Sequence, residues 1–519
     1  MGNRSVNRRA TAKAGSTSWK LKPDTARKTQ GLIASHFGHL PAAMALFLAL
    51  PMGAGGAWLL ALRQVLEFTD ATGSREDPSA AAIAFTYSGL LVMKLPTEAL
   101  DSFSVPFREG MHQVDRQRRL RDDPALSTVV AGGPRWSGNL LEAGQPPTPL
   151  TVHVALLVYE LDDERLDAVV RRVEGVLSAE KVKISHRVRL RIDIDDVTRE
   201  HFGFADGISQ PVPIGDAIVP PSGPDAATQL HWHGVKAGEI LLGHENIHNE
   251  RAPGPVLSAD AAGNTKRLSK NGAPQGFLDL GLNGSYLVIR ELKQDVAGFW
   301  RSMEAAAQAI GAPHVDGRWI AERVIGRTLD GDVLLPEGAT GPSSDQGQSH
   351  QANNFGFART DVHGFGCPLG SHIRRANPRD SLPSRDSAAP VLTGTPELLD
   401  ASKAHRILRR GRKYGPDIAD TRHDDAKERG LLFMCLNSDL VRHFEFVQQS
   451  WLLNPSFATL FDETDPLLGP HQALDPPRKM SIPACPIRWR PEVHTYVQMA
   501  GGEYFFLPSI PALDYLASL

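Results

Sequence analysis

Apolar residues repeat along this chain with two different periods. Residues 150–161 (LTVHVALLVYEL) alternate enough to form a β-strand. Residues 162–177 (DDERLDAVVRRVEGVL) follow with the spacing of an amphipathic helix and with acidic residues in the first turn. Residues 284–304 and 430–451 repeat this order of a strand and then a helix. Strand-then-helix units in both halves of the chain predict an α+β fold built from two related halves.

Shorter apolar segments add further elements to this prediction. The spacing predicts a strand-like run over 32–50, a helix over 56–67, a strand leading into a buried turn over 83–96, and a strand ending in a turn over 238–246. Segments rich in proline, glycine or polar residues separate these elements, and they cover 211–228, 247–282 and 337–352.

Residues 40–62 contain no charged residue and are long enough to span a bilayer. Pro51 and the glycines at 53, 55 and 56 interrupt this stretch in its middle. Because proline and glycine favour turns, two short buried elements joined by a turn are the preferred interpretation. A membrane-associated interaction protein is the alternative, and the basic N-terminal tail is its second support.

Composition agrees with a globular protein. The chain has 519 residues, of which 41% are hydrophobic and 22% charged, and its net charge of −3 argues against nucleic acid as the main partner. The three cysteines, Cys367, Cys435 and Cys485, form no CxxC pair, which fits a reducing compartment. Residues 1–30 carry eight Lys and Arg and one Asp, and they predict a disordered basic tail. No convincing signal peptide is present, so a cytoplasmic location is expected.

The stretch FGFADGISQP, residues 202–211, raises a question of chemistry. Asp206 lies directly before Gly207 and three residues after Gly203. Asp-Gly pairs are common in turns, because Asp tolerates turn geometry and Gly adopts positive φ. The carboxylate is therefore either a turn residue or a group that is held in place for a reaction.

Two other stretches bear on this choice, CPLGSHIRRANPRDSL (367–382) and HRILRRGRKYG (405–415). Together with GFADG they resemble, in the same order along the chain, the motifs of the dye-decolourising (DyP-type) haem peroxidase family. Further similar segments, such as NGSYLVIRELKQDVAGFW and GGEYFFLPSIPAL, extend the resemblance from about residue 30 to the end. One departure is Ala500 in VQMAGGEYFF, where that family often has arginine.

The resemblance implies an α+β fold of two ferredoxin-like halves with antiparallel sheets, of the dimeric α+β barrel type. The N-terminal half would comprise residues 31–225, including the GxxDG loop, and the C-terminal half residues 226–519. One haem b (iron protoporphyrin IX) per chain would bind in the C-terminal half.

The resemblance also implies a distal pair above the iron. Asp206 would be the acid–base group, because a carboxylate within hydrogen-bond reach can take a proton from one peroxide oxygen and deliver it to the other. An aspartate in this role implies that the enzyme works best at acidic pH. Arg409, the first arginine after Ile407 and Leu408, would stabilise the negative charge that develops on the peroxide. Arg410 is the alternative, one residue further on.

His372 in CPLGSHIRR would be the axial ligand of the iron. Its other ring nitrogen needs an acceptor, and Asp439 is the candidate for it. On the distal side, Gly203 and Gly207 would let the backbone pass close over the flat macrocycle.

Four further residues would complete the haem site by resemblance. Asn377 and Arg379 match the positions that hold the haem propionates, and charge pairing explains the arginine. Leu431 and Phe433 match the apolar lining of the distal pocket, although a generic strand would also place them in a core.

Other candidate residues have simpler explanations. His231-Trp232-His233 lacks a third ligand at suitable spacing, which disfavours a metal site there. Cys367 is expected to be a buried small residue and not a thiolate ligand. No single Trp or Tyr stands out as a route for electrons to the surface.

The implied function is a peroxidase that reduces hydrogen peroxide and oxidises dyes, phenols and other aromatic donors in one-electron steps. The alternative is a haem-binding or haem-handling protein of the same fold with little turnover, and the pair Asp206 and Arg409 argues against it. Neither nucleic-acid binding nor stable membrane insertion is expected, and self-association is common in such enzymes. The natural donor and the oligomeric state stay open.

Overall fold

The computed structural model describes residues 19–72, 77–122, 150–193, 198–337, 353–382, 396–469, 478–484 and 488–519. The predicted polar insert at 337–352 apart from its first residue, Cys485, and most of the predicted tail lie outside these residues. Within the predicted tail, the structure places strand β1 (Lys20–Leu21) and helix α1 (Pro23–Lys28), and Trp19 is buried.

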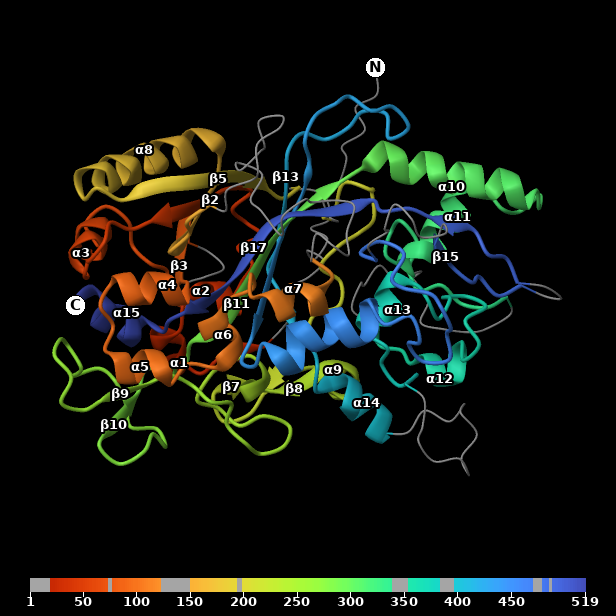
Figure 1. The fold of residues 1–519 in the computed structure, drawn as a ribbon. Coiled ribbons are helices and arrows are strands. Elements are labelled where there is room, and N and C mark those ends of the chain that lie inside the picture. The colour runs from red at the N-terminus through yellow and green to blue at the C-terminus, as the bar shows by residue number, and fades with distance from the viewer. Residues whose placement is uncertain are drawn as a thin grey trace, which may run out of the picture.

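Nine strands of the described chain form one antiparallel sheet in the order β11-β17-β3-β4-β2-β5-β13-β14-β12. Strand β11 also pairs with β14, so the sheet closes into a barrel (Figure 1). The strands are β2 (Ala42–Ala49), β3 (Ser79–Phe85), β4 (Val154–Glu160), β5 (Lys183–Arg191), β11 (Ser285–Gln294), β12 (Leu408–Arg409), β13 (Arg412–Tyr414), β14 (Gly430–Asn437) and β17 (Val497–Leu507).

Each half of the chain contributes four strand positions in the same arrangement. The N-terminal strands lie in the order β3-β4-β2-β5, with α3 (Ala57–Arg63) after β2 and α8 (Asp163–Ala179) after β4. The C-terminal strands lie in the order β17-β11-β14-β13, with α10 (Val296–Ile310) after β11 and the π-helical segments η6 (Val441–Glu445) and η7 (Val447–Leu452) after β14. This order defines a ferredoxin-like half, so the predicted fold class is confirmed.

The two halves meet at both edges of their sheets. Phe506 of β17 pairs with Phe85 of β3, and Lys413 and Tyr414 of β13 pair with β5. Alternate residues of each strand face opposite sides of the barrel wall. In β2, Ala45 belongs to the cluster that fills the barrel, whereas Leu46 packs outward under α8. Because both faces of β2 are buried, its sequence AAMALFLA is continuously apolar.

The uncharged stretch 40–62 is a buried strand, β2, followed by α3, as the preferred interpretation has it. Gly53 and Gly55 between them have φ of +70° and +58°, which fits the predicted turn. Among the described residues, no helix is long and apolar enough to cross a membrane.

Two predicted strands were wrong in whole or in part. The segment 83–96 continues as a strand only to Phe85, because Thr86 caps helix α4 (Tyr87–Val92) by accepting the N–H of Gly89 at 3.0 Å. The segment 238–246 forms no strand; it holds the short 3-10 turn η3 (Ala237–Glu239) and further turns. The run 32–50 starts with helix α2 (Gly31–Ala34) before β2.

Short elements occupy the connections. The helices are α5 (Thr97–Asp101), α6 (Val105–Glu109), α7 (Val114–Leu120), α9 (Ala226–His233), α11 (Gly317–Ile325), α12 (Phe357–Thr360), α13 (His372–Ala376), α14 (Pro396–Lys403) and α15 (Ile510–Ala517). The strands are β6 (Val212–Ile214), β7 (Ile218–Val219), β8 (Gly234–Lys236), β9 (Val256–Ser258), β10 (Phe277–Asp279), β15 (Arg478–Lys479) and β16 (Glu492–Val493).

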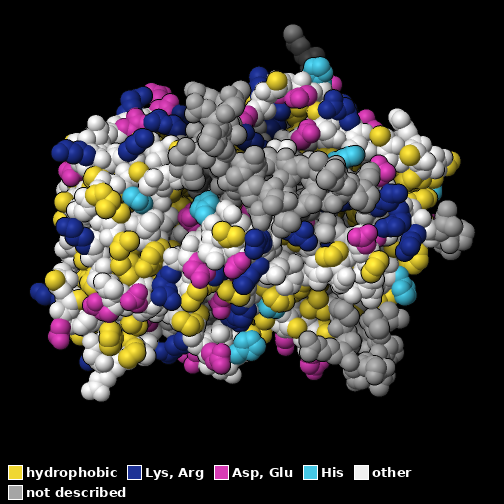
Figure 2. All heavy atoms as spheres, viewed as in Figure 1, with side chains coloured by type: hydrophobic (Ala, Val, Ile, Leu, Met, Phe, Trp, Pro, Cys, Tyr) yellow, Lys and Arg dark blue, Asp and Glu magenta, His cyan; other side chains and the backbone are white. Residues whose placement is uncertain are grey.

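Figure 1 places α10 to α13 away from α3 and α8, on the side of the C-terminal half. On the face in Figure 2, charged side chains of both signs are interspersed, in keeping with the small net charge.

Candidate functional site

The FGFADG stretch forms the tight turn of a short hairpin. Arg199 and Ala205 face each other across it, and the N–H of Gly203 donates to the carbonyl of Glu200 at 2.9 Å. Gly203 and Gly207 have φ of +100° and +77°, a conformation that other residues rarely adopt. A Cβ at Gly207 would have no atom within 4 Å. Backbone conformation, and not crowding by the described chain, therefore explains these glycines.

Asp206 leaves this hairpin toward strand β12. Its Oδ1 lies 3.5 Å from Nη1 of Arg409, and the two side chains are 40% and 35% exposed. Gln210 fastens the loop to the strand, because its side chain donates to the carbonyl of Arg409 at 3.2 Å and accepts the N–H of Arg409 at 3.1 Å. The structure thus brings the two predicted distal residues together.

Arg410 points elsewhere. Its Nε donates to the carbonyl of Leu32 at 2.7 Å and its Nη2 to the carbonyl of Ile33 at 2.5 Å. The neighbouring arginine thus holds the N-terminal segment, and the geometry favours Arg409 as the partner of Asp206.

Arg409 shares a face of the sheet with the predicted apolar lining. It pairs with Cys435 of β14, and residues directly opposite in antiparallel strands point to the same side. Phe433 and Leu431 point that way too, because side chains alternate along a strand, and both are half-buried. Met434 belongs instead to the cluster that fills the barrel. The site therefore lies outside the barrel wall, against the C-terminal half.

His372 begins helix α13, and its Nδ1 lies 2.9 Å from Oδ2 of Asp465. The other oxygen of Asp465 accepts the N–H groups of Leu467 and Leu468 at 2.9 and 2.8 Å. Burial alone would raise the pKa of Asp465, but the interaction with His372 and the backbone donors together lower it. Among the described residues, none forms a hydrogen bond with Nε2 of His372, and the side chain is 26% exposed. A fixed imidazole with one free nitrogen is a suitable axial ligand.

The prediction that Asp439 accepts from His372 was wrong. Asp439 instead accepts the N–H of Arg442 at 3.0 Å at the start of the π-helical segment. The true acceptor, Asp465, belongs to none of the motifs in the sequence. Its only local signal is the sequence DPLL, in which an aspartate before proline favours a turn closed by its own carboxylate.

Asn377 and Arg379 follow His372 in sequence, but their side chains differ in how many hydrogen bonds they form with the described residues. The Nδ2 of Asn377 lies 3.4 Å from Oγ of Ser209, and its Oδ1 is buried without a hydrogen bond to the described residues. Arg379 is buried, and it donates to the carbonyls of Asn353 and Phe355 at 2.9 Å each and to Oδ1 of Asn353 at 2.8 Å.

Arg379 belongs to a group of four guanidinium side chains, which we call the arginine cluster: Arg327, Arg379, Arg406 and Arg409. Arg327 and Arg379 share Oδ1 of Asn353, and Arg406 and Arg409 lie 3.3 and 3.4 Å from atoms of Ser209.

Burial, and in addition the charge of Arg409, lowers the pKa of Arg327 and of Arg406 to about 10. No described carboxylate lies within ion-pair distance of Arg327, Arg379 or Arg406. Because buried cations need counter-charges, the cluster fits a ligand with carboxylates. Arg327 and Arg406 were not predicted from the sequence as site residues.

The described residues hold no group of three or more His, Cys, Asp or Glu that could bind a metal ion alone. His233 of the His231-Trp232-His233 stretch is buried against Asn353, whose carbonyl lies 3.2 Å from its Nε2. Cys367 is buried, and burial raises the pKa of its thiol to about 11.

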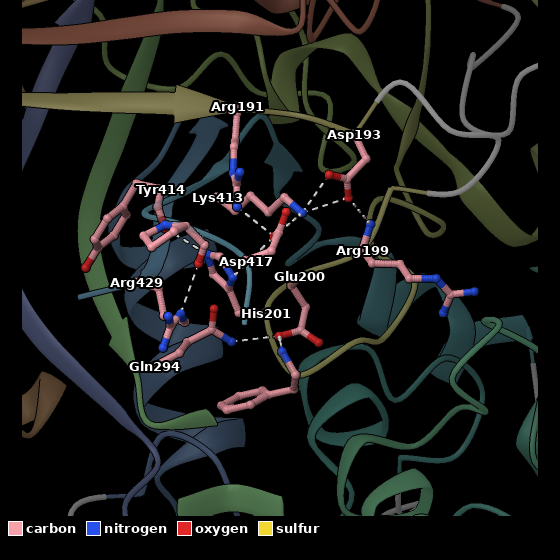
Figure 3. A network of polar contacts seen from close by, with 12 residues as sticks. Arg191, Asp193, Arg199, Glu200, His201, Gln294, Lys413, Tyr414, Asp417 and Arg429 are labelled. Carbon is pink, nitrogen blue, oxygen red and sulfur yellow. Dashed lines mark hydrogen bonds and ion pairs between the residues drawn. The ribbon is translucent and has the colours of Figure 1, made fainter. Parts of the chain in front are cut away.

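A polar network connects the hairpin that carries Asp206 to the C-terminal half (Figure 3). Nζ of Lys413 in β13 contacts Asp193 at 2.7 Å and Asp417 at 3.1 Å, and it spans the joint between the two halves. Next to it, the ring of His201 lies 2.8 Å from the carbonyl of Tyr414. These contacts attach the start of the hairpin to the C-terminal sheet.

Similarity to known proteins was found at the level of both sequence and structure, although no family model matches the chain. The chain is 30% identical over 419 residues to the multifunctional dye peroxidase DyP2 of Amycolatopsis sp., covering 76% of this chain and 74% of that protein. It is 25% identical over 485 residues to a dye-decolorizing peroxidase of Mycena epipterygia, covering 85% and 76%.

Two solved structures show the same fold. A dye-decolorizing peroxidase in complex with 2,6-dimethoxyphenol has a TM-score of 0.69 at 23% identity and covers 96% of this chain and 100% of that one. A DyP-type peroxidase from Anabaena sp. has a TM-score of 0.67 at 22% identity and covers 95% of both chains.

Proposed function

The chain belongs to the dye-decolorizing peroxidase family and is a peroxidase; from this premise we propose that it is a haem b enzyme with Asp206 and Arg409 on the distal side and His372 on the proximal side. Members of this family are haem enzymes. The observation that carries the proposal is the pairing of Asp206 with Arg409 on one side and of His372 with Asp465 on the other.

The residues present fit a haem. His372 would ligate the iron through Nε2, while Asp465 holds Nδ1 and makes the imidazole a stronger donor. Arg327, Arg379 and Arg406 of the arginine cluster, together with Asn377, would hold the two propionate carboxylates of the haem. The haem supplies the redox chemistry when bound.

Asp206 would act on hydrogen peroxide as a proton carrier. Its carboxylate would take the proton of one peroxide oxygen and deliver it to the other, which would leave as water, and the haem, when bound, would supply the two electrons that this cleavage needs. The guanidinium of Arg409 stabilises the negative charge that develops on the departing oxygen. Organic donors of the dye and phenol classes then return the enzyme to its resting state in two one-electron steps.

The test compares Asp206→Asn with the exposed control Asp216→Asn in haem-loaded protein. In stopped-flow mixing with hydrogen peroxide, Asp206→Asn should lower the rate of the Soret change by about 10²–10⁴-fold, and Asp216→Asn should not. A wild-type rate in Asp206→Asn refutes the role of Asp206. Absence of a Soret band after haem addition refutes the cofactor, and a Soret band that peroxide leaves unchanged favours the haem-handling alternative.

A further inference from the structure

We propose that Glu200 is a positioning residue for Asp206: its carboxylate accepts hydrogen bonds from backbone N–H groups of the FGFADG turn. These bonds fix the conformation of the turn and so the direction in which the Asp206 side chain points. This inference rests on the function proposed above, because it takes Asp206 as the proton carrier.

Three successive N–H groups of the turn donate to Glu200. Phe202 donates to Oε2 at 2.8 Å, Phe204 donates to Oε1 at 2.9 Å, and Gly203 between them donates to the Glu200 carbonyl at 2.9 Å. Convergent backbone N–H groups in a turn form a concave site for an anion. The φ of +100° at Gly203 lets the chain fold around the carboxylate, which gives this glycine a second purpose.

A donor from the other half of the molecule completes the site. Nε2 of Gln294, the last residue of β11, donates to Oε2 of Glu200 at 2.7 Å (Figure 3). Strand β11 pairs with β14, which in turn pairs with Arg409. Through Gln294, Glu200 therefore connects the turn that carries Asp206 to the sheet in which Arg409, the partner of Asp206, lies.

The contacts of Glu200 differ from those of a structural ion pair. Arg199 beside it pairs with Asp330 at 2.6 Å and donates to the carbonyl of Gly203 at 2.9 Å, and no described cation lies within ion-pair distance of Glu200. Burial raises the pKa of Glu200 to about 7, with the charge of Asp206 adding to the effect and the hydrogen bonds from Phe202, Phe204 and Gln294 opposing it. The buried carboxylate of Glu200 thus accepts hydrogen bonds from the backbone amides of one turn in place of water.

The test is Glu200→Gln, with Asp330→Asn, at the exposed partner of Arg199 in the loop after α11, as the matched control. A glutamine presents an NH₂ group where one carboxylate oxygen accepted an N–H, so one amide of the turn loses its partner. We expect hydrogen–deuterium exchange of the peptide amides at 202–207 to accelerate in Glu200→Gln and to stay unchanged in Asp330→Asn. An unchanged exchange pattern in Glu200→Gln overturns the proposal, whatever Asp206→Asn does.

Steady-state kinetics of the haem-loaded variants separate positioning from general damage. In Glu200→Gln, kcat/KM for hydrogen peroxide should fall about 10–100-fold, while kcat/KM for the organic donor stays unchanged. In the Asp206→Asn background, Glu200→Gln should add no further loss. Equal losses for both substrates, or a full additional loss in the double variant, overturn the proposal. A wild-type rate in Asp206→Asn alone refutes the proposed function, and faster exchange at 202–207 would then still establish that Glu200 holds the turn.

Gln294→Leu provides a second route if Glu200→Gln does not fold. It removes one donor and leaves the carboxylate, so a smaller loss for peroxide alone is expected. Failure of both variants to fold would show that Glu200 serves the fold, and it would overturn the proposal.

Discussion

Arg379 and Arg406 belong to the same arginine cluster, yet their hydrogen bonds differ. Arg379 donates to Asn353 and Phe355, and its guanidinium lies 4.0 Å from the centre of the Phe355 ring. The guanidinium of Arg406 forms one hydrogen bond with the described residues, to Oγ of Ser209 at 3.3 Å. A guanidinium with engaged donors shapes the chain around it, whereas one with open donors can bind a carboxylate. Of the two, Arg406 is better suited to hold an anion.

Variants of Arg409 and Arg410 test directly which of the two arginines acts on peroxide. Arg409→Leu should lower the rate of peroxide reaction about 10²–10³-fold, because it removes the donor that stabilises developing charge. Arg410→Leu should leave that rate unchanged but lower the free energy of unfolding by about 1–3 kcal/mol, because the buried carbonyls of Leu32 and Ile33 lose their donors. Stopped-flow mixing and denaturant titration measure the two effects, and the reverse pattern would shift the distal arginine to Arg410.

Asp465 gives a second prediction for a single residue. Asp465→Asn removes a buried negative charge next to His372 while an amide oxygen can still accept from Nδ1. The imidazole becomes a weaker donor, so the reduction potential of the haem-loaded protein should rise and peroxide turnover should fall about 10–100-fold. Spectroelectrochemical titration measures the potential, with the exposed Asp462→Asn as control. An unchanged potential would show that Asp465 does not tune His372.

At the scale of elements, the sequence predicts those whose apolar period is long and unbroken. Strand β4 with helix α8, and β11 with α10, appear where the spacing predicts them, and Asp162 caps α8 by accepting the N–H of Arg165. The motifs predict Asp206, Arg409 and His372, but not the acceptor Asp465 or the cations Arg327 and Arg406. The fold brings Asp465 and Arg327 in from other segments, so no local pattern marks them, and Arg406 is one basic residue of a run within the 405–415 stretch.

The missed elements have identifiable physical causes. Thr86 could have been recognised as a helix cap, and Gly89 leaves room for the carbonyl of His153, which an added Cβ would approach to 2.2 Å. In the segment 238–246, the apolar residues suit a strand, but Glu239 is buried and accepts from His443 and Arg442. Packing of Gly238 against the backbone of Glu245 then folds the segment back on itself. Tertiary contacts thus outweigh the local period here.

The joint between β5 and β13 carries a prediction about pH. Burial, with Lys413 and Arg191 adding to the effect, lowers the pKa of His201 to about 4. Its ordinary value is about 6.5, so the unfolded chain binds a proton between pH 6.5 and 4 that the folded chain does not. Stability is therefore lost as pH falls through this window, by about 3 kcal/mol at most.

Comparison with His201→Gln isolates this contribution. The variant lacks the titrating group, so its free energy of unfolding should fall less than that of the wild type between pH 6.5 and 4. Denaturant titrations across this range measure the difference, with the exposed His423→Gln as control. Parallel curves for His201→Gln and the wild type would show that this ring is protonated in the folded state as well.

At the scale of the whole molecule, the barrel makes each half depend on the other. The resemblance predicts two ferredoxin-like halves, and the sheet order confirms them, but the apolar pattern of the strands cannot show that β11 pairs with both β17 and β14. A closed barrel leaves the edge strands of each half paired. The proposed division at residue 225 therefore separates two halves of the sequence. Whether each half also folds independently depends on how much of its stability comes from barrel closure.

Expression of the two halves as fragments 19–225 and 226–519 answers that question. Alone, the first fragment would expose the edges of β3 and β5 and the inner-face residues Phe47 and Tyr159, which the other half covers. We expect no cooperative thermal unfolding of the fragment as a monomer, and recovery of a cooperative transition when both fragments are mixed. Self-association of the first fragment would agree with this reasoning, because a second copy can offer the missing edges. A monomeric fragment that unfolds cooperatively would show that the half is an independent domain and that barrel closure adds little to its stability.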